Sequence, residues 1–196
     1  METTDLCLLG QKYQSDKARG VGKHNYTPDY HKILNEYRNE WTNILEIGIG
    51  YYDLMVKVVG VNYAKGASLR MWREYFPNAH ITGCDINPEC MFEEERITTL
   101  ICDQNDKKSL VNMIEKVGTP QFIIDDGSHY IRHQEKSFEV LWKYLENGGI
   151  YIIEDIAKKY LERIKGLADC KEDCKVIHEH RTNKDSQGFI AFIKCV

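Results

Sequence analysis

The sequence has no long hydrophobic run. None of its apolar stretches approaches the roughly 18 residues that a membrane-spanning helix requires. The first residues, METTDLCLLGQKYQSDK, also lack the basic, apolar and small-residue regions of a secretory signal. We therefore expect a cytoplasmic protein with no membrane partner.

A large excess of charge of either sign is also missing. The 26 Lys and Arg residues and the 30 Asp and Glu residues leave a formal net charge of -4. No overall electrostatic field therefore attracts nucleic acid or an anionic membrane surface. Local basic patches remain possible, but this balance argues against a large polyanionic substrate and predicts no nucleic-acid partner.

Clustered metal-binding cysteines are absent as well. Of the seven cysteines, only Cys170 and Cys174 have a short spacing, and no second cysteine pair lies nearby. Cys84, Cys102 and Cys195 lie in apolar strand-like runs, where cysteine behaves as a small hydrophobic residue. We interpret the cysteines as structural, which fits a reducing compartment.

The length and composition predict one domain. The chain of 196 residues is 42% hydrophobic and 29% charged, which is ordinary for a globular protein with a substantial core. It contains no internal repeat and no low-complexity linker. Residues 1–26 are polar and are predicted to be irregular. We expect residues 1–42 to form a cap or helical segment of the same domain as residues 43–196.

Apolar strand patterns alternate with amphipathic helical patterns along most of the chain. Strands are predicted at 43–50, 80–86, 97–103, 121–127 and 150–155, and helices at 27–41, 66–76, 106–117, 131–146 and 157–167. This alternation predicts a parallel α/β sheet covered on both faces, with ligands at the carboxyl ends of the strands.

The end of the chain departs from this alternation. Two strand patterns, 174–180 and 188–196, flank the turn-rich segment 181–187 and predict an antiparallel hairpin. A terminal hairpin on such a sheet is typical of the single-domain, seven-stranded, Rossmann-like class I methyltransferase fold. It is unusual for a dinucleotide-binding half-domain.

The first predicted strand ends in a glycine turn, Glu46-Ile47-Gly48-Ile49-Gly50. Glycines there allow a ligand to approach the backbone closely, and Glu46 can accept a hydrogen bond. The dinucleotide motif needs a third glycine and an immediate helix, whereas here Asp53 follows and residues 51–65 delay the next helix. Taken alone, the motif is also compatible with a tight turn that binds no ligand.

Single acids end the second and third predicted strands. Asp85 is placed where an acid commonly bonds ribose hydroxyls, and Asp103 can accept a hydrogen bond from an adenine amine. Either residue alone would also serve as a helix cap. Together with Glu46 they form an acidic rim that suits a cationic adenosyl ligand better than a pyrophosphate.

Two pairs of adjacent acids follow the next two strands. Asp125-Asp126 precedes His129, and Glu154-Asp155 ends the strand after it. Because neighbouring parallel strands lie roughly 4.8 Å apart, Asp126 and the second pair can surround one ion. Three carboxylates suit a hard cation such as Mg²⁺, and Mn²⁺ or Ca²⁺ is not excluded.

Such an ion would lower the pKa of a bound hydroxyl, and His129 would remove the proton. The alternative interpretation makes Asp126 and Asp155 helix caps and His129 a surface residue. Both acid pairs together favour the metal site.

Four segments together carry a family resemblance: LEIGIG, GASLRMWREYFPNAHITGCDI, FIIDDGSHYIRHQ and GGIYIIEDI. They resemble the class I S-adenosylmethionine-dependent, metal-dependent O-methyltransferases of the macrocin and mycinamicin sugar type. The resemblance covers roughly residues 43–156 and, more loosely, 12–30. It implies methyl transfer from S-adenosylmethionine to a hydroxyl of a sugar, a sugar-nucleotide or a similar vicinal diol, and it suggests a homo-oligomer.

The resemblance also implies roles for individual residues. It implies Mg²⁺ ligation by Asp126, Glu154 and Asp155, with His129 as the general base. Cofactor contacts are expected at Glu46, Gly48, Gly50, Ser68, Asp85, Asp103 and Asp125. Acceptor contacts are expected at Tyr26, Arg132 and His133, although a solvated helix face or core packing explains these equally well. Lys17, Tyr26 and Tyr30 are candidates for a flap over the cofactor.

Two departures limit the transfer. Residues 51–65 are longer than the direct turn of many relatives, and we expect no separate amino-terminal auxiliary domain. Acceptor recognition and assembly therefore do not carry over. Alternative functions are an N-methyltransferase or catechol-type enzyme on the same scaffold, a non-catalytic S-adenosylmethionine-binding subunit and, more distantly, a nicotinamide-dependent oxidoreductase.

Overall fold

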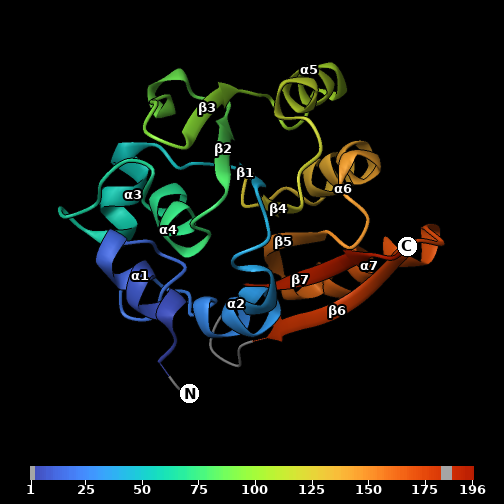
Figure 1. Cartoon of the computed structure of the whole chain (residues 1–196), viewed down its shortest axis with the longest axis horizontal. Helices are drawn as coiled ribbons and strands as arrows, with labels where there is room; N and C mark the ends of the chain where they lie inside the picture. The colour runs from blue at the N-terminus through green and yellow to red at the C-terminus, as the bar shows by residue number, and fades with distance from the viewer. Residues whose placement is uncertain (1–2, 182–186) are drawn as a thin grey trace.

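A computed structural model of the chain describes residues 3–181 and 187–196, whose strands form one seven-stranded sheet (Figure 1). The strands are β1 (Asn43–Ile47), β2 (His80–Asp85), β3 (Ile97–Ile101), β4 (Phe122–Asp125), β5 (Ile150–Ala157), β6 (Cys174–Arg181) and β7 (Gln187–Lys194). Their order across the sheet is β3-β2-β1-β4-β5-β7-β6. Strands β1 to β5 are parallel, and β7 is antiparallel to both β5 and β6. The predicted sheet with a terminal hairpin is confirmed.

Helices cover both faces of the sheet. They are α1 (Asp5–Tyr13), α2 (Thr27–Leu34), α3 (Tyr52–Val59), α4 (Ala67–Tyr75), α5 (Lys107–Val117), α6 (Ile131–Leu141) and α7 (Leu161–Lys165). Side chains of α1, α2 and α4 share one hydrophobic core with the sheet, and those of α5, α6 and α7 share the other. In the described part of the chain, none of the helices is long and apolar enough to cross a membrane.

The two cores follow from the two-residue period of the strands. Ile44 of β1 and Phe122 of β4 belong to the core with α4, whereas the next residues, Leu45 and Ile123, belong to the core with α6. All four side chains are fully buried. This burial on both faces explains why the central strands are continuous apolar runs.

The prediction that residues 1–26 are irregular is wrong for the first helix, α1. The Thr4 hydroxyl caps this helix by accepting a hydrogen bond from Cys7 N, and Leu6 and Gly10 are buried. A Cβ at Gly10 would lie 2.5 Å from Ala18 Cβ, so the helix approaches the following loop closely. Gly10 and the polar residues around it dilute the helical pattern, which is why the sequence did not reveal α1.

The long connection after the glycine turn also contains an unpredicted helix, α3. This helix has no buried residue, and Leu54 is 45% exposed. A helix that contributes nothing to the core has a weak periodic signal. The predicted helix 27–41 is shorter as well, because α2 ends at Leu34 and a 3-10 turn, Asn35–Tyr37, follows. The predicted turn at 181–187 falls largely outside the described residues.

Candidate active site

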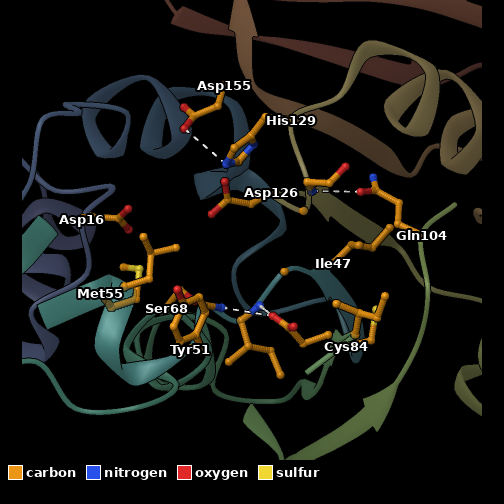
Figure 2. A pocket seen from close by; sticks show the side chains of 18 of the residues that line it. Asp16, Ile47, Tyr51, Met55, Ser68, Cys84, Gln104, Asp126, His129 and Asp155 are labelled. Carbon is orange, nitrogen blue, oxygen red and sulfur yellow. Dashed lines mark hydrogen bonds and ion pairs between the residues drawn. The ribbon is translucent and has the colours of Figure 1, made fainter. Parts of the chain in front are cut away.

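A cavity of about 530 Å³ opens at the carboxyl ends of β1, β2 and β4 (Figure 2). Strand β1 is the point from which the chain builds the sheet in both directions, with β2 on one side and β4 on the other. Open α/β sheets bind ligands at such a switch point. Predicted residues that line the cavity are Gly48, Gly50, Ser68, Asp85, Asp103, Asp126, His129, His133 and Asp155.

The glycine turn closes one side of the cavity. Gly48 has a φ of +88°, and a Cβ there would lie 2.0 Å from Asp126 O, so only glycine fits between the two strand ends. Asp85 holds this turn, because its Oδ2 accepts hydrogen bonds from Ile49 N at 3.0 Å and Gly50 N at 3.3 Å. Its carboxylate retains further lone pairs that can accept from a ligand.

Glu46 lies beneath this turn and does not line the cavity formed by the described residues. Its Oε2 accepts a hydrogen bond from Trp72 Nε1 at 2.8 Å, and its Oε1 lies 3.5 Å from Lys17 Nζ. Burial raises the pKa of Glu46 to about 7, against the opposing effect of the Lys17 charge. The structure therefore gives Glu46 a supporting position under the glycine turn at the cavity wall.

Lys17 is the centre of a buried carboxylate cluster. Its side chain is 1% exposed, and its Nζ lies 2.5 Å from Asp126 Oδ2 and 2.9 Å from Glu154 Oε2. Burial alone would lower the pKa of Lys17, but the charges of Asp126 and Glu154 hold it well above its usual value. Lys17 thus supplies a permanent positive charge to the acids that the sequence predicts as metal ligands.

Two tyrosines of the α2 region hold the second acid pair. Tyr30 donates a hydrogen bond to Glu154 Oε1 at 2.6 Å, and Tyr26 donates one to Asp155 Oδ1 at 2.7 Å. Tyr26 is 1% exposed and contacts Asp155 rather than the open cavity. Because Lys17 bonds the other oxygen of Glu154, both of its oxygens are occupied below the cavity. The expected flap residues are therefore internal supports.

Three side chains converge on the open side of this cluster. Ligand atoms of Asp126, His129 and Asp155 lie within 4.8 Å of one another. Figure 2 shows His129 directed toward Asp155, with His129 Nε2 3.8 Å from Asp155 Oδ2. The two carboxylates at the cavity wall are oxygen donors of the kind that a hard divalent cation prefers, and His129 lies beside them as a candidate base. Two of the three predicted metal ligands therefore face the cavity, and Glu154 lies behind them.

Backbone geometry and charge distinguish this group from its surroundings. His129 and Asp155 have φ values of 57° and 52°, a left-handed conformation that costs free energy in non-glycine residues and is frequent at functional sites. Burial raises the pKa of Asp155, but His24, whose Nε2 lies 3.4 Å away, and the other neighbouring donors lower it to about 2. Asp155 is therefore an anion at neutral pH.

Two other predicted residues lie away from the open cavity. Asp125 is fully buried and accepts hydrogen bonds from Gln104 Nε2 at 2.6 Å and from the Ser137 hydroxyl. It thereby orients Gln104, which does line the cavity. Arg132 is exposed and is not among the described residues that form the cavity wall, whereas its neighbour His133 is.

Sequence reasoning missed Gln104 and His24. Gln104 follows the predicted acid Asp103 directly, and His24 lies in the HNYTPDY segment, which was matched only loosely. Both line the cavity. The only sequence signal for either residue is that it lies close to a predicted site residue, Asp103 or Tyr26.

Comparison with known proteins shows what the chain is similar to. No protein-family model matches it. Demethylmacrocin O-methyltransferase of Streptomyces fradiae is 38% identical over 165 residues, which are 84% of this chain and 40% of that protein. Mycinamicin VI 2''-O-methyltransferase of Micromonospora griseorubida is 36% identical over 170 residues, 86% of this chain and 40% of that protein. The chain thus spans less than half the length of these curated relatives.

A solved structure agrees with these relatives. The MycE methyltransferase of the mycinamycin biosynthetic pathway, in complex with Mg and SAH, aligns with a TM-score of 0.77 and 28% identity, over 99% of this chain and 55% of that chain. The sheet and its cavity define a class I methyltransferase fold. Within this class, over the part that it spans, the chain is similar to sugar O-methyltransferases of the macrocin and mycinamicin type.

Proposed function

We propose that the chain is an S-adenosylmethionine- and Mg²⁺-dependent O-methyltransferase that acts on a hydroxyl of a sugar or a similar vicinal diol. The observation that carries the proposal is the group formed by Asp126, His129 and Asp155 at the wall of a cavity beside the glycine turn. The names of the related proteins, which are sugar O-methyltransferases, support it. So does the MycE complex, which contains Mg and SAH.

Each component has a distinct place in this proposal. Gly48, Ser68, Asp85 and Asp103 would hold the cofactor, and Asp126 and Asp155 would hold the ion with Glu154 as the third ligand. When bound, S-adenosylmethionine supplies the methyl group and Mg²⁺ lowers the pKa of the acceptor hydroxyl. Glu154 requires a rearrangement, because Lys17 and Tyr30 bond both of its oxygens.

His129 would act as the general base. Its side chain is 38% exposed, so it reaches an acceptor in the cavity. Asp155 stays ionised 3.8 Å from its Nε2 and stabilises the imidazolium that forms when the proton is taken. Tyr26 and His24 fix the orientation of Asp155. Much of the rate acceleration would come from holding the two reactants in place.

The amino-terminal segment would belong to the same functional unit. We assign residues 43–196 to the methyltransferase domain and residues 1–42 to its cap. Lys17, Tyr26 and Tyr30 support this assignment, because each donates a hydrogen bond to an acid at the end of β4 or β5. A sugar-bearing small molecule as acceptor, a homo-oligomeric assembly and a cytoplasmic location complete the proposal.

The decisive experiment offers labelled S-adenosylmethionine and Mg²⁺ to the purified chain, with a panel of free, nucleotide-linked and macrolide-linked sugars. Mass spectrometry of the acceptors should reveal one added methyl group on a hydroxyl. Cofactor binding without any transfer would instead favour a non-catalytic binding subunit. Methylation of an amine or a catechol would favour the corresponding alternative enzyme, and binding of NAD alone would favour an oxidoreductase.

A further inference from the structure

A second cluster of metal-ligating side chains lies between α2 and β6, outside the residues that line the cavity. Ligand atoms of Asp29, His178 and His180 lie within 4.8 Å of one another, and we call these residues the α2–β6 triad. Asp29 is in the first turn of α2, and the two histidines alternate along β6 on one face of the strand. Figure 1 shows α2 beside the terminal hairpin, although about 150 residues separate them.

The triad is centred on one carboxylate oxygen. Asp29 Oδ2 lies 2.7 Å from His180 Nδ1 and 3.6 Å from His178 Nε2. The other oxygen, Oδ1, accepts a hydrogen bond from Lys32 Nζ at 3.0 Å. Lys32 is 67% exposed at its side chain and leaves Oδ2 to the histidines. Asp29 thus directs one carboxylate oxygen, which is hydrogen-bonded to His180 Nδ1, toward both imidazoles.

The imidazole rings are held in place and are incompletely bonded. Both stack on the Phe189 ring, with ring centroids 5.5 Å away for His178 and 5.2 Å for His180. His180 is 6% exposed. His178 Nε2 is buried and has no hydrogen-bond partner among the described residues. Buried polar atoms usually have a partner, so this one calls for an explanation, which a bound ion would supply.

The donor types of the triad suit a metal ion. A neutral imidazole has a nitrogen lone pair that can bind one. The donors of the α2–β6 triad bring two nitrogens and one oxygen together. Imidazole nitrogens favour Zn²⁺ and related transition ions, whereas Mg²⁺ prefers a full set of oxygens.

We propose that Asp29, His178 and His180 form a binding site for Zn²⁺ or a similar transition-metal ion, separate from the Mg²⁺ site, with water as the fourth ligand. Donors at the usual zinc distances of about 2.0–2.2 Å lie roughly 3.3–3.5 Å apart in a tetrahedron. The two measured separations from Asp29 Oδ2, 2.7 Å and 3.6 Å, lie on either side of this value. Side-chain adjustments of less than 1 Å would therefore complete the site.

The site would act on the catalytic region through α2. The Tyr26 ring meets the His180 ring edge-on at 5.1 Å, and its hydroxyl bonds Asp155. Tyr30, on the same helix, bonds Glu154. An ion between Asp29 and β6 would fix α2 against the hairpin and thereby hold both tyrosines on their carboxylates. Zinc binding should therefore also raise the thermal stability of the chain.

The direct test is crystallography of the full chain with stoichiometric ZnCl₂ and excess MgCl₂, using anomalous scattering at the zinc edge. We expect an anomalous peak between Asp29, His178 and His180. A peak only near His129, or no peak at all, would overturn the proposal. The same experiment decides the question even if a triad variant fails to fold.

The solution test uses Co²⁺ as a visible probe in excess Mg²⁺, titrated into wild type and into His178→Gln. The wild type should give the intense absorption of four-coordinate Co²⁺. In His178→Gln the affinity should fall by more than the roughly 10–100-fold that the loss of an outer-shell partner typically causes. The matched control is His80→Gln, because the His80 side chain is exposed and the one side-chain hydrogen bond described for it is with Thr98.

His80→Gln should bind Co²⁺ as wild type does, and His129→Gln should retain the triad signal. Equal Co²⁺ affinity in wild type and His178→Gln would refute the site. Methyl transfer does not enter these measurements, so the outcome is independent of the proposed enzymatic function.

Discussion

The two pairs of adjacent acids, Asp125-Asp126 and Glu154-Asp155, differ internally in the same way. The first member of each pair is buried and bonded below the cavity: Asp125 is 0% exposed and Glu154 is 2% exposed. The second member lines the cavity, within reach of His129. In each pair, one acid thus supports the site from below and the other is the proposed metal ligand.

The two members of a pair differ in their surroundings and not in the type of side chain. Neutral donors, Gln104 and Ser137, hold Asp125, whereas Lys17 and Tyr30 hold Glu154. The outer acids also have partners, Lys17 at Asp126 Oδ2 and Tyr26 at Asp155 Oδ1, but they line the cavity. We therefore propose that the inner acids fix the strand ends and that the outer acids bind the ion.

The largest effect is expected for the base beside the outer acids. His129→Ala should lower turnover by about 10²–10⁴-fold, the range for the loss of a general base. Cofactor affinity should stay nearly unchanged, because the proposed base contacts the acceptor. Single-turnover kinetics and calorimetry measure the two quantities separately. An alanine variant as fast as wild type at neutral pH would remove His129 from the mechanism.

The next effect concerns Lys17, the cation that bonds both the outer acid Asp126 and the inner acid Glu154. Lys17→Met should lower the free energy of unfolding by about 3–5 kcal/mol, because it leaves buried carboxylates without their partner. Urea denaturation in chelator measures this loss. The matched control is Lys12→Met, since the Lys12–Glu74 pair is solvent-exposed and contributes little. Similar stability losses in the two variants would contradict the central position of Lys17.

The metal affinities compare the inner and the outer acid of one pair. Asp155→Asn should weaken Mg²⁺ binding more than Glu154→Gln, because Asp155 faces the cavity while Lys17 and Tyr30 occupy the oxygens of Glu154. Both variants should regain part of their activity in excess Mg²⁺. Calorimetric titration of folded protein gives the affinities. An equal loss of Mg²⁺ affinity in both variants would mean that Glu154 binds the ion as directly as Asp155 does. The inner and outer acids would then not differ in metal binding.

The position of this site at the carboxyl ends of the strands was predictable from the sequence. Which acid of each pair faces the cavity was not. Apolar runs that end in acids, on strands that alternate with helices, predict that Asp126 and Asp155 meet at one edge of a parallel sheet. Which acid of each pair faces the ligand depends on the backbone beyond the regular strand. Asp126 follows the last residue of β4, and Asp155 has a φ of 52°, so the two-residue period does not apply.

The contacts by which distant residues support the acids could not be predicted from the sequence either. Lys17 meets Asp126 across 109 positions, and Tyr30 meets Glu154 across 124 positions. No local spacing encodes these contacts. The helix α1 before Lys17 was missed for the separate reason that its polar residues and Gly10 conceal its buried stripe. Periodicity predicts elements that build the core, and it does not predict which side chains reach the site from outside the sheet.

The smallest effect is the pH dependence of stability, which should have opposite signs for an inner and an outer acid. Burial raises the pKa of Asp125 from 3.8 to about 6, so the folded chain retains a proton that the unfolded chain has already released. Its contribution to stability should therefore fall as pH rises from about 4 to 6. Asp155 has its pKa lowered from 3.8 to about 2, despite the opposing effect of burial, mainly by His24.

For Asp155 the unfolded chain binds the proton first as pH falls. Its contribution should be complete above the unfolded pKa of 3.8 and should disappear as pH falls toward the folded value of about 2. Urea unfolding across this pH range, in chelator, compares wild type with Asp125→Asn and Asp155→Asn. The stability difference from Asp125→Asn should decline with rising pH, and that from Asp155→Asn should increase. Parallel slopes would mean that the two acids share one environment, because only different environments give shifts of opposite sign.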